Sequence, residues 1–286
     1  MRFSVFTAST PDWTPQEAAR NIAAQGWDGI EWRITDQEDA TPPGFWAGNR
    51  STWPLTGLED SLPDIARITA ESGLAMSGLG GYAQSSNAAD VERMLRATAT
   101  LGAGQVRVTM PSNDVADYRV VADRTRGELS DHTALAAELG VKVLIELHHR
   151  TITPSASAAM RIIDRFDPAH IGVIHDLGNL IIEGNELTRA ALSVLGDHLA
   201  HVHVKNAVWK PTGEVGPHGD VRWAPEWASL RGGQASVPDY FRALREFGYD
   251  GWVTLEDFTT QLPLEERLRD ALALFHELRD APVDAV

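Results

Sequence analysis

The chain has 286 residues, of which 43% are hydrophobic and 23% are charged, so it can bury one large core without disulfide bonds. With 25 Lys and Arg against 40 Asp and Glu, its net charge of −15 would repel phosphate backbones and anionic membranes. The absence of cysteine excludes thiolate catalysis, and no apolar run reaches the ~18 residues of a membrane span. We expect one domain, residues 1–286, in the cytoplasm, with no nucleic-acid or membrane partner.

Five helix-like stretches end in a glycine that is followed by an apolar or aromatic residue and a β-rich run. Glycine at this position is typical of a left-handed helix cap that leads into a strand. The glycines are Gly26, Gly73, Gly102, Gly140 and Gly248. The first and last of these units read almost alike, GWDGIEW at 26–32 and GYDGWVT at 248–254. The sequence therefore predicts a repeated helix–strand unit.

Short runs rich in Val, Ile and Leu predict eight strands, at 2–6, 28–33, 74–79, 105–110, 142–147, 171–175, 200–204 and 251–256. Amphipathic runs predict helices at 14–25, 60–72, 88–101, 130–139, 154–166, 186–196, 238–247 and 263–279. This alternation, with no Gly-x-Gly-x-x-Gly motif after the first strand, favours an α/β fold, a single (β/α)8 TIM barrel, over a doubly wound sheet. The long segments 34–59 and 206–237 are expected to be loops that shape the mouth of the active site.

The last four predicted strands each end with a carboxylate or an imidazole, at the edge where barrel enzymes place their catalytic residues. These side chains are Glu146, Asp176, His203 and Glu256. Three carboxylates in one buried mouth would repel one another unless a cation neutralised them, so the four residues predict one divalent metal ion. An oxygen-rich set with one imidazole suits Mn²⁺, which we favour, and also Co²⁺, Mg²⁺ or Zn²⁺.

Two histidines of the seventh predicted strand, His201 and His203, are separated by one residue and therefore face the same side of the strand. His203 lies nearer the carboxyl end and is the predicted ligand. We interpret His201 as a supporting or core histidine.

With these residues in place, the sequence resembles the xylose isomerase-like barrel superfamily, which includes ketose 3-epimerases, inosose isomerases and inosose dehydratases. The resemblance covers essentially the whole chain. It rests on the four predicted ligands, on the His-x-His-x-Lys pattern that ends at Lys205, and on the Gly-Gly-Gln run at 232–234. It implies that the four residues hold the metal and that Glu146 and Glu256 move protons on opposite faces of the substrate. It also implies a homo-oligomer.

The chain departs from the ketose epimerases of this family at two positions. Those enzymes carry a histidine and an arginine that grip sugar hydroxyls where this chain has Asn179 and Trp209. The difference argues against a free ketohexose as substrate. We predict that Asn179, Lys205 and Trp209 contact the substrate. Arg33 and Arg107 are predicted to hold a carboxylate, a phosphate or a polyol, or else to act as structural counter-ions.

Glu146-Leu147-His148 followed by Thr151 is closer to the inosose dehydratases of the family. This makes His148 a candidate base, since the ordinary pKa of histidine suits proton transfer near neutrality. The alternative is a loop histidine that only orients Glu146.

We predict a divalent-metal-dependent isomerase or epimerase of a keto-sugar or keto-cyclitol. It would remove a proton next to a carbonyl while the metal stabilises the enediolate. The alternative is a lyase of the same family, inosose dehydratase-like or 3-keto-glycoside-cleaving, with His148 as an extra base. An apurinic endonuclease shares this barrel, but Arg33, Gly78 and Arg107 stand where its additional metal ligands would lie. A non-catalytic sugar-binding barrel would not need the four ligands.

Overall fold

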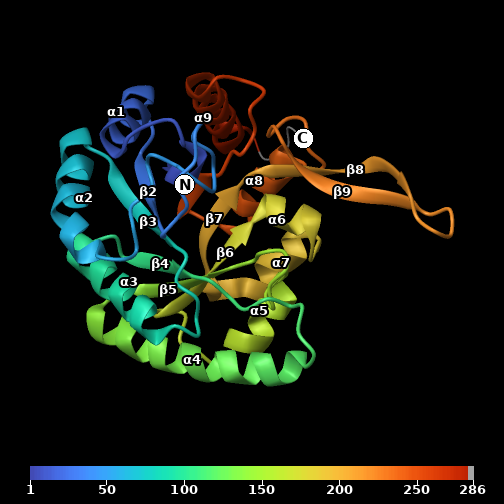
Figure 1. Cartoon of the computed structure of the whole chain (residues 1–286), viewed down its shortest axis with the longest axis horizontal. Coiled ribbons are helices and arrows are strands. Elements are labelled where there is room, and N and C mark those ends of the chain that lie inside the picture. The colour runs from blue at the N-terminus through green and yellow to red at the C-terminus, as the bar shows by residue number, and fades with distance from the viewer. Residues whose placement is uncertain (283–286) are drawn as a thin grey trace.

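The computed structural model describes residues 1–282 as a closed barrel of eight parallel strands surrounded by helices (Figure 1). The barrel strands are β1 Arg2–Phe6, β2 Gly29–Ile34, β3 Ala75–Gly81, β4 Gln105–Val108, β5 Lys142–Glu146, β6 Ile171–Asp176, β7 Leu199–Val204 and β10 Trp252–Leu255. β1 pairs with both β2 and β10 and so closes the ring. Each strand starts and ends within two residues of its predicted range, and the predicted (β/α)8 TIM barrel is confirmed.

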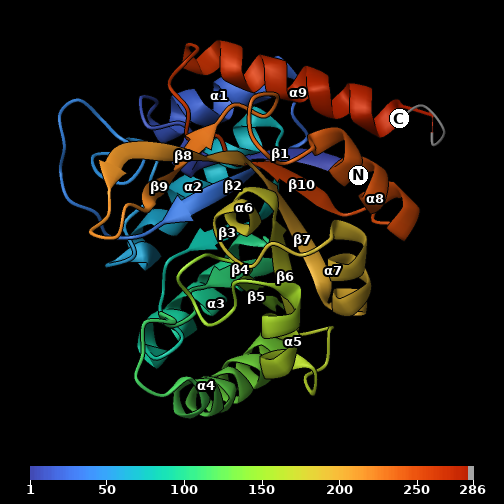
Figure 2. The same cartoon turned by 90° about the vertical axis from the view of Figure 1, so that its right-hand side faces the viewer.

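Helices cover the outside of the barrel (Figure 2). They are α1 Pro15–Gln25, α2 Leu58–Ser72, α3 Ala88–Leu101, α4 Tyr118–Leu139, α5 Ala156–Ile163, α6 Leu177–Ile182, α7 Thr188–Leu195, α8 Val237–Phe247 and α9 Leu264–Asp280, with short 3-10 turns at Thr7–Ser9 and Gly196–His198. The five predicted glycine caps all adopt left-handed backbone angles, with φ between 67° and 91°. The glycines therefore mark where α1, α2, α3, α4 and α8 end.

Two helices differ from the prediction. α4 begins at Tyr118 rather than at residue 130, because the Asp117 side chain accepts hydrogen bonds from the backbone N–H groups of Arg119 and Val120 and caps an earlier first turn. α6 was not predicted. It begins directly after β6, where the Asp176 side chain caps it by accepting a hydrogen bond from the Asn179 backbone at 2.9 Å.

The segment 206–237 is not the loop that the sequence predicts. It contains an antiparallel hairpin, β8 Asn206–Val215 and β9 Val221–Ala228, which projects from the barrel (Figure 1). Its turn is closed by a hydrogen bond from the Gly216 backbone to the Asp220 carbonyl at 2.8 Å. Pro211 and Pro225 read as loop residues, yet a two-stranded ribbon has free edges on which proline is tolerated. The other long segment, 34–59, has no regular helix or strand between β2 and α2, as predicted.

The apolar core lies between the barrel strands and the helices that cover them. Phe3, Val5, Phe241 and Phe275 are fully buried in it, and Phe3 packs against both other rings. No helix among residues 1–282 is long and apolar enough to cross a membrane. This packing fixes the carboxyl ends of the strands, where the candidate site lies.

Candidate active site

The carboxyl ends of four neighbouring strands bring the predicted metal ligands together. Glu146 and Asp176 are the last residues of β5 and β6, His203 lies in β7, and Glu256 follows β10 directly. The register explains their common level, because Asp176 pairs with His203 and His203 pairs with Thr254. One ligand atom from each of the four residues lies within 4.8 Å of the others, and none of the four is more than 5% exposed.

His203 points its Nδ1 atom at all three carboxylates. The distances are 3.6 Å to Glu146 Oε1, 3.8 Å to Asp176 Oδ2 and 3.6 Å to Glu256 Oε1. These are longer than hydrogen bonds, and this buried nitrogen has no hydrogen-bond partner among the described residues. Three carboxylate oxygens and one unpartnered imidazole nitrogen that converge on one point fit a divalent metal ion.

The charges around this cluster lead to the same conclusion. The Lys205 ammonium forms ion pairs with Asp176 and Glu256, and the Arg107 guanidinium donates a hydrogen bond to Glu146 Oε2 at 2.6 Å. A fourth buried carboxylate, that of Glu31, lies on the other side of His203, at 3.0 Å from its Nε2. Two cations therefore face four carboxylates, and with neutral histidines one divalent cation would balance the remaining charge.

The pKa values of Glu146 and Asp176 are shifted in opposite directions from their ordinary values. Burial alone would raise both, but the Arg107 guanidinium holds the pKa of Glu146 well below its usual range. Burial, with Glu256 and Glu146 nearby, raises the pKa of Asp176 well above its usual range although Lys205 opposes this. The mutual repulsion that raises the pKa of Asp176 would be offset by a cation bound between these carboxylates.

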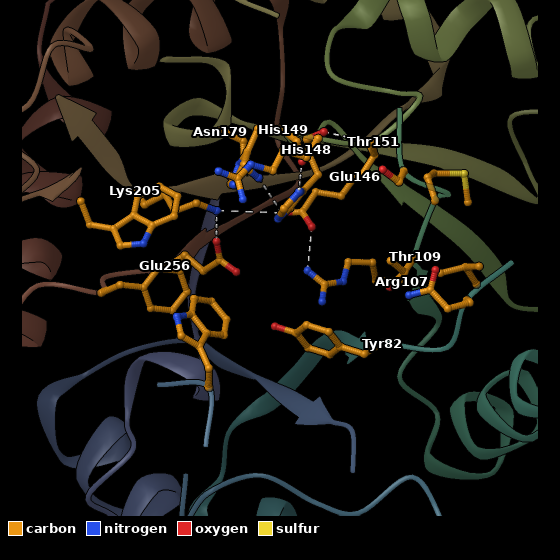
Figure 3. Close-up of a pocket in the computed structure, with 18 residues that line it drawn as sticks. Tyr82, Arg107, Thr109, Glu146, His148, His149, Thr151, Asn179, Lys205 and Glu256 are labelled. Carbon is orange, nitrogen blue, oxygen red and sulfur yellow. Dashed lines mark hydrogen bonds and ion pairs between the residues drawn. The ribbon is translucent and has the colours of Figure 1, made fainter. Parts of the chain in front are cut away.

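A cavity of about 590 Å³ opens above these residues (Figure 3). Glu146, Glu256 and Lys205 line its floor, whereas Asp176 and His203 lie fully buried below. Its aromatic lining consists of Trp46, Tyr82, Trp227 and Phe258. Its polar lining includes Gln84, Thr109, Ser112, His148, His149, Arg150 and Thr151. Such a mixture of aromatic faces and hydroxyl or amide groups suits a sugar or cyclitol ring.

His148 lines the cavity two residues after Glu146, but not as part of a continued strand, because β5 ends at Glu146. A turn follows instead, in which the Thr151 hydroxyl donates a hydrogen bond to the His148 carbonyl at 2.7 Å. His148 Nδ1 lies 2.7 Å from the His149 carbonyl, which can only accept, so Nδ1 carries the hydrogen. The neutral ring thus keeps an unprotonated Nε2, and burial lowers the pKa of His148.

Three of the five predicted substrate contacts line the cavity: Arg107, Asn179 and Lys205. Asn179 donates a hydrogen bond to Glu146 Oε1 at 3.2 Å. The Lys205 stem packs closely against Gly178, where a Cβ atom would lie 2.4 Å from its Cγ. Only glycine at that position leaves room for the lysine.

The other two predicted contacts, Arg33 and Trp209, are not among the residues that line the cavity. The Arg33 guanidinium donates hydrogen bonds to Gln37 and Thr52 and lies 5.1 Å from the Tyr82 ring, so it supports the wall from behind. Trp209 Nε1 donates a hydrogen bond to the Ile181 carbonyl at 2.9 Å, because β8 packs on α6. This tryptophan attaches the hairpin to the barrel.

Sequence reasoning missed two residues of this region. Glu31 of β2 is 2% exposed and contacts both His201 and His203, at 2.9 and 3.0 Å. Its signal was a charged residue inside an apolar predicted strand. Tyr82 directly follows β3 and lines the cavity, with the Arg107 guanidinium 4.2 Å from its ring. An aromatic residue after a barrel strand was its signal. The supporting role expected of His201 agrees with its contacts.

Comparison with known proteins finds similar sequences and structures, and it identifies a family for this barrel. An inosose dehydratase from Lacticaseibacillus casei is 25% identical over 129 residues, 42% of this chain and 42% of that protein. Two solved structures share the fold. The 3-keto-D-glucoside 4-epimerase from E. coli has a TM-score of 0.71 and 20% identity, over 98% of this chain and 100% of that one. The D-allulose 3-epimerase from Methylomonas sp. has a TM-score of 0.71 and 15% identity, over 97% and 98%. The model of the xylose isomerase-like TIM barrel family matches residues 19–278, and the chain belongs to this family.

Proposed function

We propose that the protein is a divalent-metal-dependent isomerase or epimerase that acts on a keto-sugar or keto-cyclitol. The observation that carries the proposal is the convergence of three buried carboxylates and the unpartnered Nδ1 of His203 at the base of the cavity, partly below its floor. The relatives' names support the substrate class, since they describe a keto-glucoside epimerase, a ketose epimerase and an inosose dehydratase. The chain spans less than half the length of that dehydratase.

The proposed reaction begins with removal of a proton from the carbon next to a carbonyl. Held by Glu146, Asp176, His203 and Glu256, a divalent metal such as Mn²⁺ would act as a Lewis acid toward that carbonyl. Glu256 takes the proton in this proposal. Among the described residues one donor, Lys205, bonds its carboxylate, whereas two donors, Arg107 and Asn179, bond Glu146. Return of the proton by Glu256 to the neighbouring carbon is isomerisation. Epimerisation would instead place a proton on the opposite face, which Glu146 can deliver once it has taken one from water in the cavity, while Glu256 returns its own proton to water.

The remaining lining residues bind and orient the substrate in this proposal. Arg107, Asn179 and Lys205 offer N–H donors to substrate hydroxyls near the floor. Trp46 and Trp227 offer aromatic faces on which a sugar ring can stack, and they exclude water from the reacting carbon.

The test is solvent exchange with the Mn²⁺-loaded enzyme in D₂O. A 3-keto-glucoside, a ketohexose and an inosose would each be incubated and followed by NMR and mass spectrometry. We expect deuterium at the carbon next to the carbonyl of at least one substrate, and a product whose mass differs from the substrate only by that deuterium. No exchange into any of the three classes by metal-loaded enzyme would contradict the proposal.

A lyase is the second candidate, and one observation favours it. His148 lines the cavity and keeps an unprotonated Nε2 without being one of the four proposed ligands, so it can serve as a separate base. The same incubation distinguishes the two reactions. Loss of one water, or of the group attached to a 3-keto-glycoside, identifies elimination and rules out the isomerase.

A further inference from the structure

A second buried cluster lies directly behind the proposed metal ligands, on the side away from the cavity. Glu31 Oε2 is 2.9 Å from His201 Nε2 and 3.0 Å from His203 Nε2, and all three side chains are at most 2% exposed. One oxygen of the Glu31 carboxylate thus faces two imidazole nitrogens at hydrogen-bond distance, and an ionised carboxylate can only accept hydrogen bonds.

The hydrogen on His201 is located by its other neighbour. Gln105 Nε2 is a donor, and it lies 2.7 Å from the Ser77 carbonyl and 2.9 Å from His201 Nδ1. The carbonyl can only accept, which fixes the orientation of the Gln105 amide. His201 Nδ1 therefore accepts, and the hydrogen of the neutral ring is on Nε2, where it is donated to Glu31.

The same logic applies to His203. Because the Glu31 carboxylate accepts, His203 Nε2 must carry a hydrogen. In the neutral ring this leaves the lone pair on Nδ1, the atom that lies 3.6 to 3.8 Å from the three carboxylates. We infer that Glu31 is a positioning residue that fixes the tautomer of His203, so that a lone pair rather than an N–H group faces the metal ligands. This inference rests on the metal site of the proposed function.

Glu31, His201 and His203 also lie close enough together to hold a metal ion themselves. Their hydrogen bonds argue against this, since the two Nε2 atoms that face Glu31 both carry hydrogens. Thr254 Oγ1 also lies 2.9 Å from His201 Nε2, and neither Glu31 nor His201 lines the cavity. The cluster is a hydrogen-bonded support of the ligand His203. A carboxylate behind a ligating histidine typically contributes 10–100-fold in metal affinity.

The test measures Co²⁺ binding, by its visible absorption and by calorimetry, without any substrate. Glu31→Gln keeps the shape of the side chain but removes its charge and allows its amide to donate to His203 Nε2. We expect Co²⁺ to bind about 10–100-fold more weakly. Ser4→Ala is the matched control, because Ser4 is also fully buried and bonds Thr254 at 2.6 Å without touching His203. It should bind Co²⁺ as the unmodified protein does.

Co²⁺ affinity of Glu31→Gln within twofold of the unmodified protein would overturn the inference and leave the proposed function intact. Failure of the unmodified protein to bind Co²⁺ would overturn both. A measurement on the unmodified protein covers the case in which Glu31→Gln does not fold. In the Zn²⁺-loaded protein labelled with ¹⁵N-histidine, NMR should show a protonated His203 Nε2 and a zinc-shifted Nδ1. A protonated Nδ1 would refute the assignment of this tautomer. A purely structural role of Glu31 makes no prediction about which nitrogen carries the hydrogen.

Discussion

The two halves of the barrel contribute different chemistry to one site. The last four strands, β5, β6, β7 and β10, deliver Glu146, Asp176, His203 and Glu256, and Lys205 follows β7. The first four strands deliver none of these. They contribute Phe6, Glu31 and Arg107, which contact the first group from behind or from the side. Tyr82, directly after β3, contacts Arg107 and lines the cavity. The second half carries the proposed ligands, and we propose that the first half controls their charge and orientation.

The contacts between the halves show how this control works. Arg107 of β4 bonds Glu146 at 2.6 Å, and Glu31 of β2 bonds His203 at 3.0 Å. The Phe6 ring of β1 stacks on His203 with ring centroids 5.8 Å apart. These contacts are possible because side chains inside a closed barrel point toward a common axis. Changes in the ligand half should therefore abolish function, and changes in the supporting half should shift it.

The largest effect is expected in the ligand half, from Glu256→Gln. The substitution removes a carboxylate that we propose as both metal ligand and base, so the bound Mn²⁺ per chain should fall sharply. Turnover should drop by at least the ~10²–10⁴-fold typical of a lost acid–base group. Metal analysis and steady-state kinetics check this. Glu226→Gln, an exposed carboxylate of β9, is the control for charge. Unchanged metal content in Glu256→Gln would place the metal elsewhere.

His148→Ala tests the ligand half where the two candidate reactions differ. If the enzyme is a lyase, elimination should fall by ~10²–10⁴-fold, while metal binding and deuterium exchange next to the carbonyl are partly retained. If it is an isomerase, substantial activity should remain, because the glutamates suffice. His149→Ala is the matched control, since His149 lines the same cavity and bonds Asn179. Loss of the metal in His148→Ala would show that both assignments misplace this residue.

Arg107→Met tests the supporting half through pH. Arg107 holds the pKa of Glu146 low, so Glu146 stays ionised and able to bind metal in acidic solution. Without the guanidinium that pKa rises, and Co²⁺ binding should be lost at a higher pH as the solution is acidified. We expect the midpoint to move up by about 1–3 pH units. Arg107→Lys keeps the charge and should shift it less. Equal midpoints in all three proteins would show that Arg107 does not control Glu146.

The sequence indicated the four side chains that the structure brings together in the ligand half, but not Glu31 or Tyr82 of the supporting half, for a physical reason. Glu146, Asp176, His203 and Glu256 each stand at the end of an apolar strand, where the fold itself indicates function. Glu31 lies inside its strand, and its role depends on an imidazole 172 positions away in the chain. Periodicity along one strand carries no information about which side chains meet across a barrel.

The hairpin and two helix starts show a second limit of the sequence. The prolines of β8 and β9 hid a ribbon whose pairing is fixed by local hydrogen bonds that composition does not reveal. α6 and the first turns of α4 depend on the caps Asp176 and Asp117. Asp176 therefore lies among the predicted ligands and also caps α6, and a single aspartate after a strand does not reveal the second of these roles.

The smallest effect is expected from Tyr82→Phe, in the supporting half. The ring lies 4.2 Å from the Arg107 guanidinium and 5.1 Å from that of Arg33, and phenylalanine preserves this arrangement. Only the hydroxyl is lost from the cavity, and one neutral hydrogen bond contributes about 0.5–1.5 kcal/mol. We expect kcat/KM to fall by up to about tenfold, mainly through KM, with unchanged Co²⁺ affinity. Trp223→Phe, on the exposed part of β9, is the control. A loss in Tyr82→Phe as large as that in Glu256→Gln would mean that the supporting half also supplies a catalytic group, and the division between the halves would not hold.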